Sequence, residues 1–395
     1  MVTTDFLVIG GGIIGINIAR DLKRKFRDQS VTLIEKEPEV AQHASGRNSG
    51  VLHAGFYYTA DSLKAKFTRQ GNLAMHEYCA AKKLKMHTCG KLVVAKDESE
   101  HPVLDTLLER GKKNGVPLEK ITAEDARKIE PRVKTYRHAL WSPTTTSVDP
   151  VAVTLAMRAD AEAEGVAIRT GVAYLGRRNG TLRTSAGEMQ AGYVVNSAGL
   201  YADKIAQDFG FSEHFRVLPF KGVYLYSSEG HGALHTHIYP VPDLRNPFLG
   251  VHFTVTADEH IKIGPTAIPA FWREQYEGLK GFSATEMADI VWRQAGLLLF
   301  AGFDFRRLAY EELRKYVRSH LVSLATSLLE GVTPDNFKHW GRAGIRAQLL
   351  DIRTRKLIMD FLFEKDDRSL HILNAVSPGF TCSIPFARHI VEQIG

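Results

Sequence analysis

Near the start of the chain, two short apolar runs flank a segment whose apolar residues recur at helical spacing. Residues 5–9 (DFLVI) predict a short buried strand, because four of the five side chains are apolar. Residues 13–26 place apolar side chains three or four positions apart, which predicts a helix. A second β-rich run, SVTLIEKE, occupies residues 30–37. The order of strand, helix and strand is typical of a parallel βαβ unit.

Later segments also alternate between strand and helix patterns. Residues 166–191 alternate like a strand meander with Asn-Gly turns, and residues 188–207 predict a strand followed by a helix. Residues 216–270 predict strands and turns, and residues 284–331 predict helices. A last helix is predicted over residues 384–393. The sequence therefore predicts an α/β protein of the two-domain α+β kind.

Three glycines lie between the first predicted strand and the first predicted helix. Gly10, Gly12 and Gly15 form the spacing G-x-G-x-x-G. In this setting the first glycine permits a tight turn, the second lets the backbone approach a pyrophosphate, and the third allows close packing of helix on strand. The amide groups at the helix start, around Ile13 and Ile14, then attract the phosphates.

An acidic residue completes this pattern. Glu35 follows the second predicted strand and lies 20 residues after Gly15, where a carboxylate accepts hydrogen bonds from the ribose hydroxyls of a dinucleotide. Its neighbour Lys36 is a further cofactor-binding candidate. The alternative is a glycine-rich turn that binds nothing, but strand, glycines, helix, second strand and acid together favour a dinucleotide.

Composition limits the class of protein. A chain of 395 residues is too long for a single small core, so two domains are expected. Its three cysteines form no C-x-x-C pair, which favours a reducing, cytoplasmic compartment and gives no reason to expect a metal site. The N-terminus lacks the basic start of a signal peptide. No apolar run reaches the roughly 20 residues that cross a bilayer.

Several longer motifs resemble one family of flavoproteins. In chain order they are HASGRNSGVLHAGFYY, CGKLVVA, VLPFKGVYL, IYPVPDLRNPFLGVHFT, IGPTAIPAFWREQY, GRAGIRAQ and NAVSPGFTCSIP. The chain is similar to the L-2-hydroxyglutarate dehydrogenases or oxidases, which belong to the FAD-dependent D-amino-acid oxidase superfamily. IYPVPD followed by PFLGVHFT is very specific to that family, whereas G-x-G-x-x-G is widely shared.

The resemblance implies a glutathione-reductase-type FAD-binding Rossmann domain built from residues 1–82, 148–216 and 338–395. Residues 83–147 and 217–337 are then expected to form a substrate domain with a mixed or antiparallel sheet. The implied cofactor is FAD. Candidate FAD-binding residues outside the glycine motif are Ser45, Gly46, Asn48, Ser49, Gly50, Val172, Ala198, Gly199, Ser377, Pro378, Gly379, Phe380 and Thr381.

The implied reaction is oxidation of L-2-hydroxyglutarate to 2-oxoglutarate by hydride transfer to flavin N5. It needs a base for the hydroxyl proton and cations for two carboxylates. His53 and His252 are the candidate bases, and a structural role is the alternative for each. Arg346 is the first candidate for a carboxylate because its planar fork suits bidentate pairing. The further catalytic candidates are Lys221, Arg273 and Tyr57.

Departures from the family pattern leave the exact substrate open. Lys221 and Val223 stand where the family is expected to have an arginine and an acid, and Gly379 and Phe380 also depart from it. The alternatives are oxidation of another 2-hydroxy acid, of glycerol 3-phosphate or of an amino acid. An RNA-associated flavoprotein is less favoured. The net charge of +7 permits it, but no arginine-rich arm supports it, so no nucleic acid partner is expected.

One apolar run bears on the electron acceptor. Residues 297–303 are apolar except for glycine and are followed by aromatic and basic residues. The run is too short to span a membrane, but it suits the headgroup region, where a reduced flavin could reach a quinone. A buried helix is the alternative. The expected partners are a small 2-hydroxy dicarboxylate and a quinone or other acceptor. Peripheral association with the inner face of the cytoplasmic membrane stays open.

Overall fold

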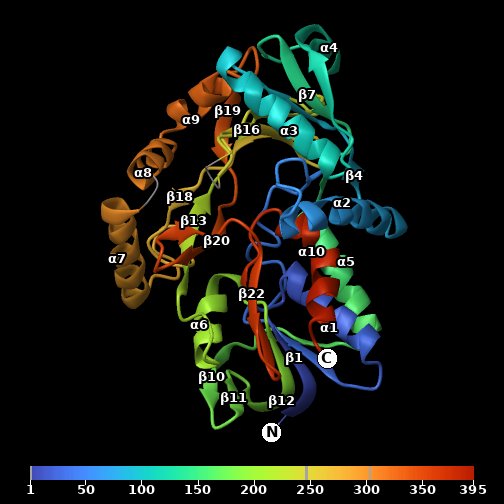
Figure 1. The fold of residues 1–395 in the computed structure, drawn as a ribbon, viewed down its shortest axis with the longest axis vertical. Coiled ribbons are helices and arrows are strands. Elements are labelled where there is room, and N and C mark those ends of the chain that lie inside the picture. Colours follow the sequence, from blue (N-terminus) through green and yellow to red (C-terminus); the bar gives the residue numbers. More distant parts are fainter. Residues whose placement is uncertain (1, 245–247, 302–303) are drawn as a thin grey trace. The chain divides into compact units, whose positions relative to one another are not determined.

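The computed structural model describes residues 2–244, 248–301 and 304–395, which belong to two compact units (Figure 1). Unit 1 contains residues 1–48, 150–219 and 346–395, and unit 2 contains residues 49–149 and 220–345. Two of the points where the chain changes unit lie within strands, β13 (Phe215–Gly222) and β20 (Gly344–Asp351). Both units are therefore discontinuous in the sequence.

The units differ from the predicted domain boundaries chiefly over residues 49–82, which the sequence places in the FAD domain and which lie in unit 2. Backbone pairing explains the difference, because β3 (Val51–Leu52) pairs with β8 (Thr146–Val148). The helix α2 (Leu63–Ala81) is attached in the same way, since the Asn72 side chain donates a hydrogen bond to the Thr144 carbonyl at 3.1 Å. The other boundaries differ by two, three and eight residues: unit 1 resumes at residue 150 where 148 was predicted, ends its second segment at 219 where 216 was predicted, and resumes at 346 where 338 was predicted.

Unit 1 is built on a sheet with parallel central strands. β1 (Val2–Ile9) pairs in parallel with β2 (Val31–Ile34) on one side and with β12 (Gly187–Asn196) on the other. β9 (Ala167–Arg169) extends this set beyond β2, and β23 (Ser369–Asn374) extends it beyond β12. The middle strands are apolar because both faces of a parallel sheet are covered. Antiparallel strands complete the sheet: β10 (Tyr174–Arg178), β11 (Thr181–Thr184) and β22 (Leu362–Lys365).

Helices cover the unit 1 sheet. α1 (Ile13–Lys25) packs against α5 (Pro150–Ala163) and α10 (Gly379–Glu392), and the three helices lie together in Figure 1. α10 corrects the predicted start of the last helix at residue 384. The sequence suggests a late start because Pro385 lacks an amide hydrogen, yet Pro385 lies inside the helix. Unit 1 also contains α6 (Ala202–Asp208) and β21 (Lys356–Leu357).

Unit 2 is built on an eight-stranded mixed sheet, as predicted. Its strand order is β19 (Phe337–Trp340), β14 (Leu225–Ser227), β17 (Ile261–Gly264), β16 (His252–Val255), β15 (His237–Pro240), β5 (Lys91–Val94), β7 (His138–Ser142) and β6 (Glu119–Thr122). Only β15 and β5 pair in parallel among the described strands of this sheet. A row of apolar side chains crosses one face and belongs to the core: Leu92, Ile238, Phe253, Ile263 and Leu225.

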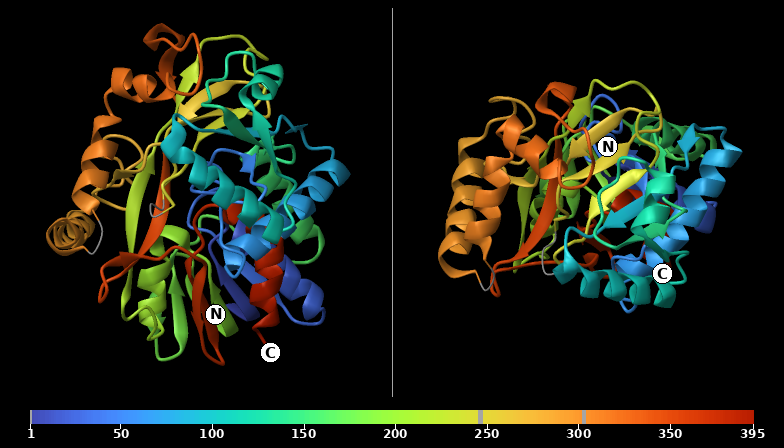
Figure 2. Two further views of the ribbon diagram at one scale, coloured as in Figure 1. Left: turned by 45° about the horizontal axis from the view of Figure 1, so that its top comes forward. Right: turned by 90° about the horizontal axis from the view of Figure 1, so that it is seen from above.

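Helices and short strands surround this sheet. α3 (His101–Lys113) and α4 (Ala123–Ile129) contact β7, and β4 (Met86–His87) pairs with β8. The predicted helical segment contains α7 (Ala284–Phe300), α8 (Phe305–Arg314) and α9 (Arg318–Ala325), drawn in orange in Figures 1 and 2. α8 contacts β18 (Ile268–Pro269), and α9 contacts β17. No helix within the described ranges is long and apolar enough to span a bilayer.

Candidate functional site

The glycine turn of unit 1 has no room for side chains at two of its three motif positions. Gly10 has φ +110°, and a Cβ atom there would lie 2.7 Å from the carbonyl oxygen of Ser197. A Cβ atom on Gly15 would lie 2.0 Å from the carbonyl oxygen of Gly10. At Gly12 the nearest atom to such a Cβ is Ser45 Oγ, at 3.1 Å. The turn therefore needs glycine for its backbone conformation and for close packing on α1.

The start of α1 suits an anion. Its N-cap is Gly12, which has no side chain, and its first turn contains no acidic residue. The Ile13 amide donates a hydrogen bond to Ser45 Oγ at 2.8 Å, which places Ser45 beside the helix start together with Ile14. The helix dipole and the amides of the first turn favour a phosphate here. The residues present therefore fit the pyrophosphate of a dinucleotide.

Glu35 lies directly after β2, as the sequence predicts. Its Oε2 accepts a hydrogen bond from the Gly11 amide at 2.7 Å, and its Oε1 accepts one from the Glu37 amide at 2.9 Å. A carboxylate has about four lone-pair sites, so these two bonds leave acceptor capacity for ribose hydroxyls. Val172 lies beside it, because the Val172 amide donates to the Glu35 carbonyl at 2.8 Å.

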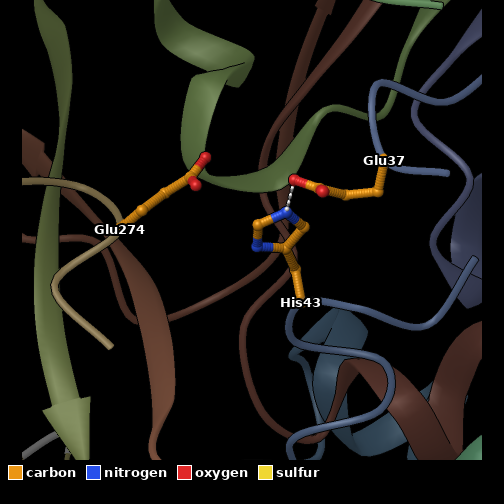
Figure 3. A group of neighbouring side chains, drawn as sticks. All are labelled: Glu37, His43 and Glu274. Atoms are coloured by element: carbon orange, nitrogen blue, oxygen red, sulfur yellow. Dashed lines mark hydrogen bonds and ion pairs between the residues drawn. The ribbon is translucent and has the colours of Figure 1, made fainter. Parts of the chain in front are cut away.

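A charged pair that the sequence did not single out lies next to Glu35. His43 Nε2 lies 2.9 Å from Glu37 Oε1 (Figure 3), and Glu274, which is also drawn there, belongs to unit 2. Lys36 Nζ lies 2.6 Å from the same Glu37 oxygen. Burial acts to raise the pKa of Glu37, but the hydrogen bonds from Lys36 and His43 outweigh it and lower that pKa. Lys36, a predicted cofactor-binding residue, is therefore paired with the Glu37 carboxylate within unit 1.

The remaining cofactor candidates are divided between the units. Gly46 is tightly packed in unit 1, since a Cβ atom there would lie 1.9 Å from the Ala41 carbonyl oxygen, and Asn48 donates to the Ser45 carbonyl at 2.8 Å. Ser49 and Gly50 belong to unit 2. Ala198 and Gly199 follow β12, and Ser377 and Pro378 precede α10. Gly379, Phe380 and Thr381 form the first turn of α10 instead of the predicted loop. Their contacts with FAD stay predictions.

In unit 2, strand pairing gathers polar residues on the sheet face opposite the apolar row. Lys91 of β5 pairs with His237 of β15, and Thr254 of β16 pairs with Lys262 of β17. Since Ile238 pairs with Phe253, His237 lies opposite Thr254, and these four side chains form a row across four strands. All four are buried. We call this set, with its neighbours Tyr239 and His252, the polar face.

His252, a predicted base, is a neutral imidazole on this face. Its Nδ1 lies 2.8 Å from the Gly250 carbonyl oxygen, which only accepts, so Nδ1 carries the hydrogen and Nε2 the lone pair. The ring stacks on Tyr239 with centroids 3.7 Å apart. Burial lowers the pKa of His252 to about 3, and the nearby cations Lys91 and Lys262 act in the same direction.

His53, the second predicted base, contacts a lysine that the sequence missed. Its Nδ1 lies 3.4 Å from Lys91 Nζ, which donates. Burial lowers the pKa of His53 well below its ordinary value, and Lys91 adds to the effect. Lys91 Nζ also lies 4.1 Å from the ring centroid of Tyr239 and 5.3 Å from that of Tyr57. Burial lowers the pKa of Lys91 to about 7.

The other three predicted catalytic residues have local contacts of their own. Arg273 is buried in unit 2, with its Nε 3.9 Å from a carboxylate oxygen of Glu286. Lys221 lies on β13 in unit 2, and burial lowers its pKa. Arg346 lies in unit 1 and donates through Nε to Gln348 Oε1 at 3.0 Å. The structure thus gathers His53, Tyr57 and His252 near Lys91 and Tyr239, and the catalytic roles of all six residues stay predictions.

Sequence patterns did contain a signal for the missed lysines. Lys91 stands in KLVV and Lys262 in IKIG, and each replaces one apolar residue of a strand that is otherwise apolar. A charged residue at such a position is buried when the strand is central. His237 is different, because its Nδ1 accepts from the Val255 amide at 3.1 Å, which makes it a hydrogen-bonded core histidine.

The parallel sheet, the glycine turn and the acid after β2 define a dinucleotide-binding fold of the flavoprotein class, with a second unit on a mixed sheet. The family described as "FAD dependent oxidoreductase" (DAO) matches residues 5–393. The chain belongs to this family, and its cofactor is FAD. The predicted fold class, cofactor and enzyme class are confirmed.

The chain is similar to relatives and to solved structures over nearly its whole length. Mitochondrial L-2-hydroxyglutarate dehydrogenase of Homo sapiens is 37% identical over 413 residues, covering 99% of this chain and 88% of the relative. L-2-hydroxyglutarate dehydrogenase of Escherichia coli (strain K12) is 35% identical, with coverage of 99% and 93%. L-alpha-glycerophosphate oxidase from Mycoplasma pneumoniae with FAD bound has a TM-score of 0.77 at 22% identity, with coverage of 99% and 94%. Glycine oxidase from Geobacillus kaustophilus has a TM-score of 0.73 at 18% identity, with coverage of 100% and 96%.

Proposed function

We propose that this flavoprotein oxidises L-2-hydroxyglutarate to 2-oxoglutarate. The observation that carries the proposal is the polar face, where a neutral histidine stands among buried cations. Such a face suits an anionic substrate that must lose a proton from a hydroxyl group. The relatives that share 35–37% identity with the chain are named for this substrate.

His252 is our candidate base. When bound, FAD supplies the acceptor for the hydride that leaves the substrate's α-carbon. The hydroxyl proton moves to Nε2 of His252, because Nδ1 already donates to the Gly250 carbonyl. The same bond, together with stacking on Tyr239, holds the ring in one orientation. The negative charge of the bound substrate favours the imidazolium that forms.

His53 takes a different role in this proposal. Lys91 donates to its Nδ1, so its remaining hydrogen is on Nε2, and His53 acts as a hydrogen-bond donor that orients the substrate. The proximity of Lys91 further opposes protonation of His53. Tyr57 adds a second donor, because its buried hydroxyl has no hydrogen-bond partner among the described residues.

The test is an anaerobic titration of the FAD-loaded protein, followed by visible absorbance. L-2-hydroxyglutarate, its D enantiomer, glycerol 3-phosphate and a D-amino acid are added separately. Bleaching of the oxidised flavin band by the L-2-hydroxy acid alone is the expected result. Bleaching by glycerol 3-phosphate or the amino acid instead would refute the assigned substrate while keeping the family.

We also propose that a quinone accepts the electrons and that α7, α8 and α9 rest on a membrane surface from the cytoplasmic side. Leu297 of the predicted apolar run is buried, whereas Leu299 and Phe300 are 62% and 61% exposed; Gly302 and Phe303 lie outside the described residues. Trp292 is 79% exposed. Basic residues follow this apolar surface: Arg306, Arg307, Arg314 and Arg318. Exposed apolar side chains beside cations suit an anionic bilayer interface.

Vesicle sedimentation tests this surface. A variant with Trp292→Gln and Leu299→Gln is compared with Leu175→Gln, which changes a side chain that is 58% exposed in unit 1. We expect the first variant to lose binding to phosphatidylglycerol vesicles and the second to bind like the wild type. Equal binding by all three proteins would show that this surface does not contact the membrane.

A further inference from the structure

We propose that Lys91 and Lys262 together form a receptor for a dicarboxylate, with one lysine for each carboxylate and His252 between them. The inference rests on the proposed function and deepens it, because it names the residues that make the site select a substrate with two carboxylates. Neither lysine was a candidate from the sequence.

Strand register places the two lysines on either side of His252. Lys91 lies on β5 and Lys262 on β17, and β15 and β16 separate them. Three strand spacings of about 4.8 Å put their backbones about 14 Å apart. Each ammonium stands on a flexible four-carbon stem, so the two groups can converge on a short linear molecule. Since His252 lies on β16, the strand order alone puts it between the two lysine-bearing strands.

Both lysines are buried without a carboxylate. Lys91 is 0% exposed and Lys262 is 4% exposed. Their contacts are with neutral groups: Lys91 with His53 and the Tyr239 ring, and Lys262 with the Ser49 carbonyl oxygen at 3.2 Å and the Tyr224 ring at 4.5 Å. In the described parts of the chain, no Asp or Glu forms an ion pair with either one. Other buried cations of unit 2 do have such partners, as Lys315 has Glu312.

A buried ammonium without a counter-ion is unfavourable, and two on one sheet face are more so. A ligand with two negative charges removes this cost at both positions. The unpartnered Tyr57 hydroxyl lies on the same side, since Lys91 Nζ is 5.3 Å from the Tyr57 ring centroid. The charge pattern therefore predicts selection of a dicarboxylate over a monocarboxylate of the same length.

The experiment measures equilibrium binding of glutarate and of butyrate to the FAD-loaded protein by calorimetry. Neither probe has the 2-hydroxyl group, so binding is separated from oxidation. The variants are Lys91→Met and Lys262→Met, and both should fold, since methionine has a similar length and removes a buried charge. The matched control is Lys120→Met on β6 of the same sheet, where Lys120 Nζ pairs with Asp105 at 2.6 Å.

We expect wild type and Lys120→Met to prefer glutarate over butyrate. Each of the other two single variants should weaken glutarate binding by about 10- to 100-fold, as for loss of a hydrogen bond to a charged group, and should reduce the preference to near unity. Unchanged glutarate binding in both variants would overturn the inference. If L-2-hydroxyglutarate still bleached the flavin in that case, the proposed function would stand and only the role of the two lysines would fail. If glutarate binding depended on both lysines but the flavin were not reduced by L-2-hydroxyglutarate, only the assigned substrate would fail.

Discussion

Replacing Gly15 with alanine is the sharpest test of the cofactor unit. The new Cβ atom would lie 2.0 Å from the Gly10 carbonyl oxygen and 2.5 Å from Ser197 Oγ. Cβ atoms almost never approach other atoms closer than 3.0 Å, so α1 must move from the turn by at least 1.0 Å (3.0 minus 2.0). Overpacking of this kind costs about 3 kcal/mol when the contact is with backbone. The shift also displaces the amides at the start of α1, so the amount of FAD bound per chain should decrease.

The assay is the FAD content per chain after desalting, together with the midpoint of thermal unfolding. Gly296→Ala in α7, where a Cβ atom meets nothing within 4 Å, serves as the control. Gly296→Ala should raise the unfolding free energy by up to about 1 kcal/mol through helix propensity. Full FAD content and a wild-type midpoint in Gly15→Ala would refute the packing argument.

Three further predictions concern individual side chains. His252→Gln should slow flavin reduction about 100-fold or more by removing the base, and stopped-flow rates within twofold of wild type would exclude that role. The second prediction concerns Lys91, whose pKa is about 7. The neighbouring side chains stay neutral near this pH: burial lowers the pKa values of His53 and His237. Burial also raises the pKa values of Tyr57 and Tyr239. Lys91 therefore loses its charge as pH rises, and kcat/KM should fall about tenfold between pH 7 and 8.5; a flat profile, or the same fall in Lys91→Arg, would contradict this. Burial lowers the pKa of His371 to about 4, so the unfolded state binds more protons between about pH 6.5 and 4 and stability falls as pH falls. The free energy of unfolding should fall by about 2 kcal/mol between pH 7 and 5. The unfolding midpoint of His371→Gln should therefore decrease less on acidification than that of the wild type.

The sequence alone determined the glycine turn and the acid of the cofactor unit, because their signals are local. A strand, three glycines, a helix and an acid all lie within residues 2–35, and their spacing dictates the turn that the structure shows. Steric limits on the backbone act between near neighbours, so they can be predicted from residue order. The start of α10 was missed because Pro385 argues locally against a helix that packing on α1 supports.

Only the tertiary structure decided the polar face. Lys91, His252 and Lys262 belong to separate strands, and the register between those strands sets which residues meet. A shift of one residue in the strand register would move each side chain to the opposite face of the sheet. No local sequence pattern excludes such a shift. The Gly250 carbonyl sets which His252 nitrogen carries the hydrogen, and burial sets the pKa values of both lysines. Charge state depends on surroundings that residues far apart in the chain build together, and residue order does not reveal them.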